Sequence, residues 1–276
     1  MRKERRWLTA VCVMLWCVVM LCGTAWALMD GIVWPEATGE VVETADKLTI
    51  DESHMEKGFV MVHGPATDKA LKLQVEKDGA KLMYDINGKQ DWEIIPLQLG
   101  DGKYTFSLFV SAGGNKYASG GKLAVNAKLD SQNAAYLVPT QYVYYEVDTP
   151  AVAKSDEICE GLTTDQEKFD AIREYIKENY EYDFKKAQSA LPAGTLPSVD
   201  YAWEKGMGIC QDLAALAACM LRVQGIPTRL EIGYVGGNYY HAWNSVVING
   251  QAVQYDPTVD VTDAIPGGNY RLERYY

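Results

Sequence analysis

The chain has 276 residues and a formal net charge of −11 at pH 7. Hydrophobic residues make up 48% of it, so a folded globular protein is expected rather than a disordered chain. An acidic protein is repelled by nucleic-acid phosphate, and no compact cluster of lysine and arginine interrupts the chain after its N-terminus. We therefore expect no nucleic-acid partner.

The first 27 residues indicate an export signal. The basic start MRKERR precedes an apolar run from Trp7 to Cys22, and an A-x-A cleavage pattern ends at Ala27. The run is short for a membrane span of ~20 residues, so cleavage after Ala27 is the preferred interpretation and an uncleaved anchor is the alternative. We expect an extracytoplasmic protein, secreted or at the cell surface, that contacts a membrane only through an uncleaved N-terminal segment.

Hydrophobic periodicity divides the rest of the chain into a linker and two domains. Residues 28–47 lack a pattern and are interpreted as the linker. Residues 48–149 contain short runs of alternating apolar and polar residues, such as Leu71–Val75 and Tyr104–Val110, separated by turn signals. Such runs predict a small all-β domain, and we expect an immunoglobulin-like sandwich.

Residues 150–276 combine helical and strand patterns. A T-x-x-E capping box at Thr164–Glu167 begins one helix, and an alanine-rich helix over Gln211–Val223 must be buried on most sides. Between them we expect a loop from Leu191 to about Tyr201. The predicted strands that follow are Thr228–Val235, Tyr240–Ile248 and Gln251–Tyr255. Helices followed by an antiparallel sheet predict an α+β domain.

The cysteines do not form a disulfide scaffold. Those inside the predicted signal are Cys12, Cys17 and Cys22, and those in the mature chain are Cys159, Cys210 and Cys219. Three is an odd number, so at least one thiol is free or joined to another molecule. Buried thiols are expected at Cys159 and Cys219, with pairing between them as the alternative.

Cys210 directly precedes the predicted buried helix. Helix N-termini favour anions, and the thiolate is the reactive form of cysteine. The position therefore indicates a reactive thiol, and the alternative is an inert cysteine that packs at a helix start.

A predicted hairpin brings a histidine close to a carboxylate. Asn249-Gly250 is the strongest signal for a two-residue turn. In the register that this turn sets, His241 and Asp256 are diagonal neighbours on one face, ~7–8 Å apart between backbones. A carboxylate there can hold the imidazole in one tautomer, and the imidazole can activate Cys210 if the cysteine's helix docks against this face. That docking does not follow from the pattern, and a plain ion pair at a sheet edge is the alternative.

Five motifs share the order and spacing of a known family: G-I-C-Q-D-L-A (208–214), L-R-V-Q-G-I-P-T-R (221–229), G-Y (233–234), H-A-W (241–243) and D-P-T (256–258). Together they resemble the transglutaminase-like superfamily, over about residues 160–260 and most densely from 206 to 258. The resemblance implies a papain-like core with Cys210 as nucleophile, His241 as general base and acid, and Asp256 as orienting carboxylate. It also implies a thioester intermediate.

The resemblance implies an enzyme that acts on a peptide or glutamine-type amide. Transglutaminases pass the acyl group to an amine, while peptidases and amidases pass it to water, and the sequence leaves this choice open. The alternative is a catalytically inactive surface-binding or scaffold module that keeps the fold. By location, cell-wall peptides or surface proteins are candidate substrates.

Further residues are candidates for the same site. The backbone N–H of Cys210 is a natural oxyanion donor, and the candidates for a second donor are Tyr201, Trp203 and Gln211. The candidates for substrate binding are Trp243, Tyr201, Trp203, Gln211 and Tyr182, with aromatic packing as the alternative. Asp212 is interpreted as an acid that favours the helix dipole. We expect no metal or cofactor, because no cluster has metal-ligand spacing and no phosphate-binding glycine motif occurs.

Overall fold

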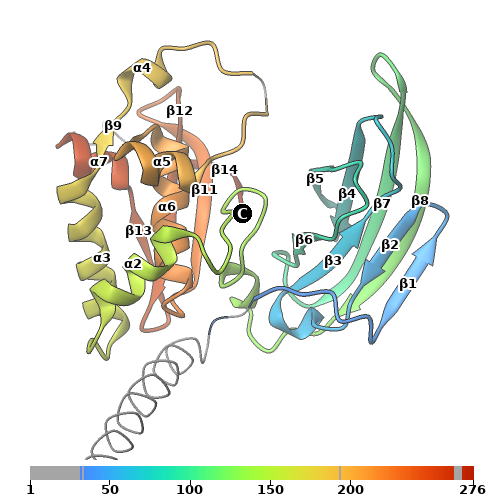
Figure 1. The fold of residues 1–276 in the computed structure, drawn as a ribbon, viewed down its shortest axis with the longest axis horizontal. Helices are drawn as coiled ribbons and strands as arrows, with labels where there is room; N and C mark the ends of the chain where they lie inside the picture. Colours follow the sequence, from blue (N-terminus) through green and yellow to red (C-terminus); the bar gives the residue numbers. More distant parts are fainter. Residues whose placement is uncertain (1–31, 33, 193, 264–268) are drawn as a thin grey trace, which may run out of the picture. The chain divides into compact units, whose positions relative to one another are not determined.

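The computed structural model describes residues 32, 34–192, 194–263 and 269–276. From Val33 to Tyr276 the chain forms one compact unit, which Figure 1 draws as a ribbon. The predicted export signal, residues 1–27, lies outside the described residues. Within the ranges given, no helix is both long enough and apolar enough to cross a membrane.

The N-terminal part of this unit is β-rich and holds two antiparallel sheets. The first has the order β1-β2-β3-β6, with strands Val42–Ala45, Leu48–Asp51, Phe59–His63 and Glu93–Pro96. The second has the order β5-β4-β7-β8, with strands Ala80–Ile86, Leu71–Lys77, Gly102–Gly113 and Lys116–Ala127. Short 3-10 helices, η1 (Met55–Lys57) and η2 (Ala134–Tyr136), contact each other beside them. The β-rich class is confirmed, while the immunoglobulin-like classification stays a prediction.

The predicted linker, residues 28–47, is wrong at its C-terminal end. Val42–Ala45 form β1, which lies at the edge of the first sheet and pairs with β2. The side chains of β1 are almost all exposed. An exposed edge strand needs no alternation of apolar and polar residues, and so β1 lacked the pattern by which strands are predicted.

The C-terminal part is a four-stranded antiparallel sheet with helices. Its strand order is β13-β12-β11-β14, with strands Gln251–Tyr255, Tyr239–Ile248, Thr228–Val235 and Arg271–Tyr275. A parallel pair is formed by β9 (Glu181–Tyr182) and β10 (Met207–Gly208). The helices are α2 (Pro150–Cys159), α3 (Asp165–Asn179), α4 (Phe184–Ala187), α5 (Val199–Lys205), α6 (Cys210–Arg222) and α7 (Pro257–Thr262). The predicted mixture of helices and an antiparallel sheet is confirmed.

Helix α3 begins at the predicted capping box. The Thr164 hydroxyl accepts from the Glu167 N–H at 3.2 Å, and the Glu167 carboxylate accepts from the Thr164 N–H at 3.0 Å. One face of the helix is buried, through Phe169, Ile172 and Ile176. The reciprocal cap satisfies donors that the first turn of a helix leaves without intrahelical partners.

Helix α6 is the centre of the C-terminal part. It packs on β11 and β12, and α2, α3 and α5 pack against it (Figure 1). Every residue from Asp212 to Arg222 is buried, as the apolar sequence predicts. The buried amide of Asn244 in β12 donates to the carbonyls of Ala214 in α6 (3.0 Å) and Arg229 in β11 (3.2 Å). These bonds fix the helix to the sheet.

Strands β12 and β13 form the predicted hairpin. The strands pair as far as Ile248 and Gln251, on either side of the turn. Asn249 and Gly250 have φ angles of 52° and 76°. A type I′ turn requires positive φ at both positions, which asparagine and glycine tolerate. Both the turn and its register are therefore confirmed.

The predicted loop from Leu191 to Tyr201 is too long, because α5 begins at Val199. The Ser198 hydroxyl caps this helix by accepting from the Tyr201 N–H at 3.0 Å. Strand β14 was not predicted at all. Four of its five residues are exposed, so its sequence carries no period that marks a strand.

A buried arginine ties α6 to three other segments. Arg222 is only 1% exposed, and it donates to the carbonyls of Thr228 (2.9 Å), Val138 (2.7 Å) and Tyr276 (3.1 Å). Burial lowers its pKa to about 10. Three carbonyl acceptors compensate in part for the loss of water around the guanidinium.

Replacing Arg222 by alanine should destabilise the fold strongly. The change removes the arginine's donors from three carbonyls, of which that of Tyr276 keeps the Leu230 N–H, and opens a cavity, so we expect a loss of about 3 kcal/mol or more in free energy of unfolding. Arg271→Ala, which removes an exposed arginine, should change it by less than about 0.5 kcal/mol. Denaturant titrations of both variants measure this, and equal losses would contradict the assignment.

Candidate active site

The structure brings Cys210, His241 and Asp256 together. Nε2 of His241 lies 2.7 Å from Oδ2 of Asp256. The Cys210 thiol lies close enough to the same imidazole to raise the pKa of His241. Because Asp256 occupies Nε2, the nitrogen left for the sulfur is Nδ1. One imidazole therefore bridges a carboxylate and a thiol, an arrangement suited to nucleophilic catalysis.

Two further groups hold the Asp256 carboxylate. Its Oδ1 accepts from the Thr258 N–H at 3.0 Å, so the residue also caps α7. Its Oδ2 accepts from the Tyr270 hydroxyl at 2.6 Å. Tyr270 was missed by sequence reasoning, because it follows the last recognisable motif and belongs to no periodic segment. Asp256 is only 8% exposed, so these bonds set its orientation in a buried place.

Trp243 packs behind the imidazole. It is not among the residues that line the cavity next to Cys210. It is 2% exposed, and its indole N–H donates to the half-buried Glu231 carboxylate at 2.7 Å. Its ring lies parallel to that of His241, with centroids 6.3 Å apart, and edge-on to that of Tyr270 at 4.9 Å. Substrate binding by Trp243 stays a prediction, and its observed contacts place it against the imidazole plane.

The surroundings of His241 favour its protonated form. Burial lowers the pKa of the imidazole, but the interactions of the imidazole with Asp256 and Cys210 outweigh burial and raise its pKa to about 10. At neutral pH the imidazole is then positively charged. A positive imidazolium stabilises a neighbouring thiolate, which is the nucleophilic form of cysteine.

Cys210 opens into a cavity of about 430 Å³. The cysteine is half-buried at the N-terminal end of α6. The loop around Leu191–Thr195 forms one side of the cavity, and its other polar lining residues are Tyr142, Tyr182, Gln211, Tyr240 and Arg274. Of the residues predicted to bind substrate, the cavity thus includes Tyr182 and Gln211.

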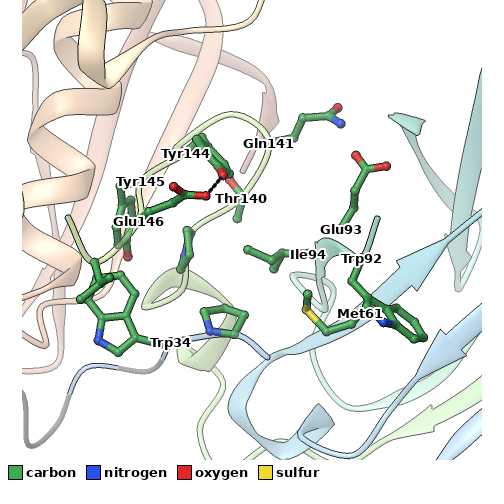
Figure 2. A pocket seen from close by; sticks show the side chains of 13 residues that line it. Trp34, Met61, Trp92, Glu93, Ile94, Thr140, Gln141, Tyr144, Tyr145 and Glu146 are labelled. Atoms are coloured by element: carbon green, nitrogen blue, oxygen red, sulfur yellow. Dashed lines mark hydrogen bonds between the residues drawn. The ribbon is translucent and has the colours of Figure 1, made fainter. Parts of the chain in front are cut away.

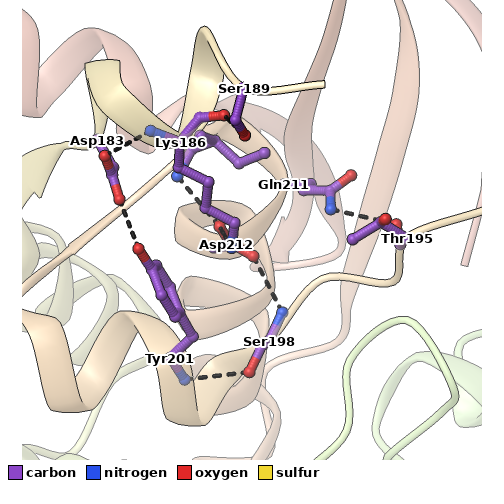
Figure 3. Close-up of polar contacts among 9 residues, drawn as sticks. Asp183, Lys186, Ser189, Thr195, Ser198, Tyr201, Gln211 and Asp212 are labelled. Atoms are coloured by element: carbon purple, nitrogen blue, oxygen red, sulfur yellow. Dashed lines mark hydrogen bonds and ion pairs between the residues drawn. The ribbon is translucent and has the colours of Figure 1, made fainter. Parts of the chain in front are cut away.

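Polar contacts around Asp212, drawn in Figure 3, hold the loop that lines this cavity. The Asp212 carboxylate is fully buried and accepts from Lys186 Nζ of α4 (2.7 Å) and from the Ser198 N–H (3.1 Å). It also accepts from the Ile209 N–H at 3.2 Å, which caps α6. Asp212 therefore does more than favour the helix dipole, because it joins both ends of the loop that lines the cavity, at Lys186 and Ser198, to the start of α6.

Tyr201 and Trp203 do not contribute to the cavity. The Tyr201 hydroxyl donates to Asp183 at 2.6 Å, and Lys186 Nζ lies 3.7 Å from the centroid of its ring (Figure 3). Trp203 is not among the lining residues. That either residue binds substrate or donates to an oxyanion stays a prediction.

Gln211 and Tyr182 remain as side chains that can face a substrate. The Gln211 amide donates to the Thr195 carbonyl at 3.3 Å, so one of its two N–H groups is already used. Burial, followed by the charge of Cys210, raises the pKa of Tyr182 to about 12. Its hydroxyl therefore keeps its proton at neutral pH and can donate a hydrogen bond inside the cavity.

The other described cysteines differ from Cys210. Cys159 and Cys219 are both free and buried, so the alternative of a disulfide between them is wrong. Burial raises the pKa of Cys159 to about 11 and that of Cys219 further still. Buried thiols of raised pKa are inert.

A second cavity, of about 560 Å³, contains no residue of the triad. Its aromatic lining residues are Trp34, Trp92, Tyr144 and Tyr145 (Figure 2). It lacks a thiol or an imidazole, so nucleophilic chemistry points to the cavity of Cys210. Among the residues that the structure describes, no group of three or more histidine, cysteine or acidic side chains is placed to hold a metal ion.

The fold and the Cys-His-Asp geometry define a domain of the papain-like class. Residues 152–257 match the sequence model of the Transglutaminase-like superfamily, and this segment belongs to that superfamily. Its bounds enclose Cys210, His241 and Asp256 as well as α6. No curated protein is significantly similar to the chain in sequence.

Similarity to solved structures is weak. A Cytophaga hutchinsonii protein, described provisionally as a cysteine protease, is 16% identical, with 86% of this chain and 81% of that chain covered and a TM-score of 0.40. The periplasmic domain of TgpA from Pseudomonas aeruginosa is 18% identical, with 82% and 93% covered and a TM-score of 0.37. A protein from Parabacteroides distasonis, described provisionally as a protease, is 16% identical, with 72% and 37% covered and a TM-score of 0.34.

The charge state of His241 can be measured directly. In an NMR titration its ring should change charge near pH 10, because Asp256 and Cys210 stabilise the protonated form. Asp256→Asn should move the pKa of His241 down towards the ordinary value of ~6.5. Asp260→Asn is the matched control, since this carboxylate of α7 pairs with Arg173 instead and should leave His241 unchanged. A wild-type titration near pH 6.5 would contradict the assignment.

Proposed function

We propose that the chain is a cysteine acyl-transfer enzyme that forms a thioester on Cys210 from a peptide or glutamine-type amide. The observation that carries this proposal is the single imidazole of His241, held by Asp256 at 2.7 Å and placed beside a thiol that opens into a cavity. A buried ion pair with no thiol beside it would need no catalytic explanation.

The first half of the reaction forms the thioester. The Cys210 thiolate attacks the carbonyl carbon of the amide, and the carbonyl oxygen becomes negatively charged. The N–H of Cys210 is the first of α6 and has no intrahelical acceptor, so it can donate to this oxygen. Protonated His241 then gives its proton to the leaving nitrogen, the carbon–nitrogen bond breaks, and an amine or ammonia departs.

The second half releases the acyl group. Neutral His241 accepts a proton from the incoming amine or water, which attacks the thioester carbonyl. The carbon–sulfur bond breaks, and the Cys210 thiolate and the His241 imidazolium are restored. Tyr182 is our candidate for the second oxyanion donor, since it lines the cavity and keeps its proton at neutral pH.

The location of the protein belongs to the same proposal. The basic start, the apolar run and the A-x-A pattern of residues 1–27 support export. Peptides and proteins of the cell surface are then the accessible substrates, with an amine or water as acceptor. The inactive scaffold module is the competing proposal, and loss of any one triad residue would have favoured it.

Glutamine-containing peptides, incubated with and without a primary amine, test the proposal. Mass spectrometry should show amine incorporation or peptide hydrolysis by the full chain, and Cys210→Ala should lower the rate at least about a thousandfold. Cys159→Ala, which removes a buried thiol outside the cavity, should retain activity within a few-fold. Amine incorporation identifies a transferase, and hydrolysis alone identifies a hydrolase. Turnover that persists in Cys210→Ala would refute the mechanism.

A further inference from the structure

The cavity of Cys210 contains an arginine in an acidic protein. Its lining includes one cation, Arg274, and neither an aspartate nor a glutamate. The chain as a whole has a formal net charge of −11. An anionic group that enters this cavity therefore meets a positive charge in the same cavity as the candidate nucleophile, while the net charge of the chain repels it.

Arg274 is fixed at the edge of the cavity by its neighbours. It lies on β14, paired with Ile232 of β11, which also lines the cavity. Its Nη2 donates to the Tyr240 hydroxyl, and the guanidinium lies 5.8 Å from the centroid of the Tyr240 ring. A guanidinium has five N–H donors, so this contact leaves several of them for a ligand.

The charge of Arg274 has no carboxylate partner among the residues that the structure describes. No aspartate or glutamate oxygen lies within 4.0 Å of it, whereas Arg173 pairs with Asp260 and Lys186 pairs with Asp212. Glu273 precedes Arg274 at a β-bulge of the strand, and its charge acts on the Arg274 guanidinium without forming an ion pair within 4.0 Å. Arginine binds carboxylates through paired, charge-assisted hydrogen bonds, so the free donors suit such a ligand.

We propose that Arg274 binds a carboxylate of the substrate, and that the enzyme prefers peptides with a carboxylate close to the amide that Cys210 attacks. The proposal rests on the function proposed above and narrows its substrate class. The carboxylate can be an acidic side chain or a free α-carboxyl group. Both present the same planar pair of oxygens to the guanidinium.

Alkylation of Cys210 tests the proposal without turnover. The probes are N-bromoacetylglycine, with a free α-carboxylate, and the α-amide of N-bromoacetylaspartate, with a side-chain carboxylate. The corresponding neutral amides, N-bromoacetylglycinamide and the α-amide of N-bromoacetylasparagine, are the references. In each case the sulfur displaces bromide, and mass spectrometry of the Cys210 peptide gives the rate.

The wild-type protein should react faster with at least one of the carboxylate probes than with its neutral reference. In Arg274→Gln this rate ratio should fall about tenfold, while the rates of the neutral probes stay within twofold. Arg274→Lys should retain part of the preference, and it serves as a second variant if the first does not fold. The carboxylate probe that loses its rate advantage in Arg274→Gln identifies the group that Arg274 binds, either the α-carboxyl or the side-chain carboxylate.

Arg271→Gln is the matched control. Arg271 lies on the same strand, but its guanidinium stacks 4.5 Å from the Tyr234 ring centroid and does not line the cavity. The proposal is overturned if the ratio is the same in wild type and Arg274→Gln, or if Arg271→Gln lowers it equally. An inactive wild type in the glutamine-peptide assay would instead refute the proposed function, because alkylation does not depend on turnover.

Discussion

The site depends on the docking of α6 against β12. The helix brings Cys210 as its first residue, and the strand brings His241, so the thiol and the imidazole meet only if the two elements hold a fixed distance. Asn244 fixes it, because one buried amide donates both to Ala214 of the helix and to Arg229 of the next strand. Arg222 secures the far end of the helix to three carbonyls.

The electrostatics of the site follow from this docking. Burial by itself disfavours a charged imidazole, yet the carboxylate on one side of His241 and the thiol on the other raise its pKa to about 10. Asp256 can act in this way because Thr258 and Tyr270 hold its two oxygens in place. Trp243, held by Glu231, packs parallel to the imidazole ring. The residues around Asp256 and His241 thus favour the positively charged imidazole that lies beside Cys210.

Local patterns in the sequence predicted the parts of this arrangement but not their assembly. The Asn249-Gly250 turn sets the hairpin register, and so the approach of His241 to Asp256 could be derived from the chain alone. The docking of α6 could not be derived in the same way, because a helix that is buried on all sides has no distinct face that must meet the sheet. Exposed edge strands such as β1 and β14 were missed for the opposite reason, since they carry too few buried residues.

The residues that complete the site were beyond sequence reasoning because they are distant in the chain. Tyr270 contacts Asp256 across a segment with no recognisable motif, and Lys186 reaches Asp212 from a separate short helix. Arg274 belongs to β14, which no pattern predicted. The sequence predicted that three aromatic residues face a substrate: Trp243, Tyr201 and Trp203. Such a prediction is ambiguous, because an aromatic residue near a motif fits a groove and a core equally well.

The most direct test of the central claim, that His241 makes Cys210 a nucleophile, is its alkylation rate with iodoacetamide at pH 6. A thiol with the ordinary pKa of ~8.5 is only ~0.3% thiolate at this pH. We predict that Cys210 in the wild-type protein reacts at least about tenfold faster than Cys210 in His241→Ala, in which no imidazolium stabilises the thiolate. Equal rates in the two proteins would contradict the account.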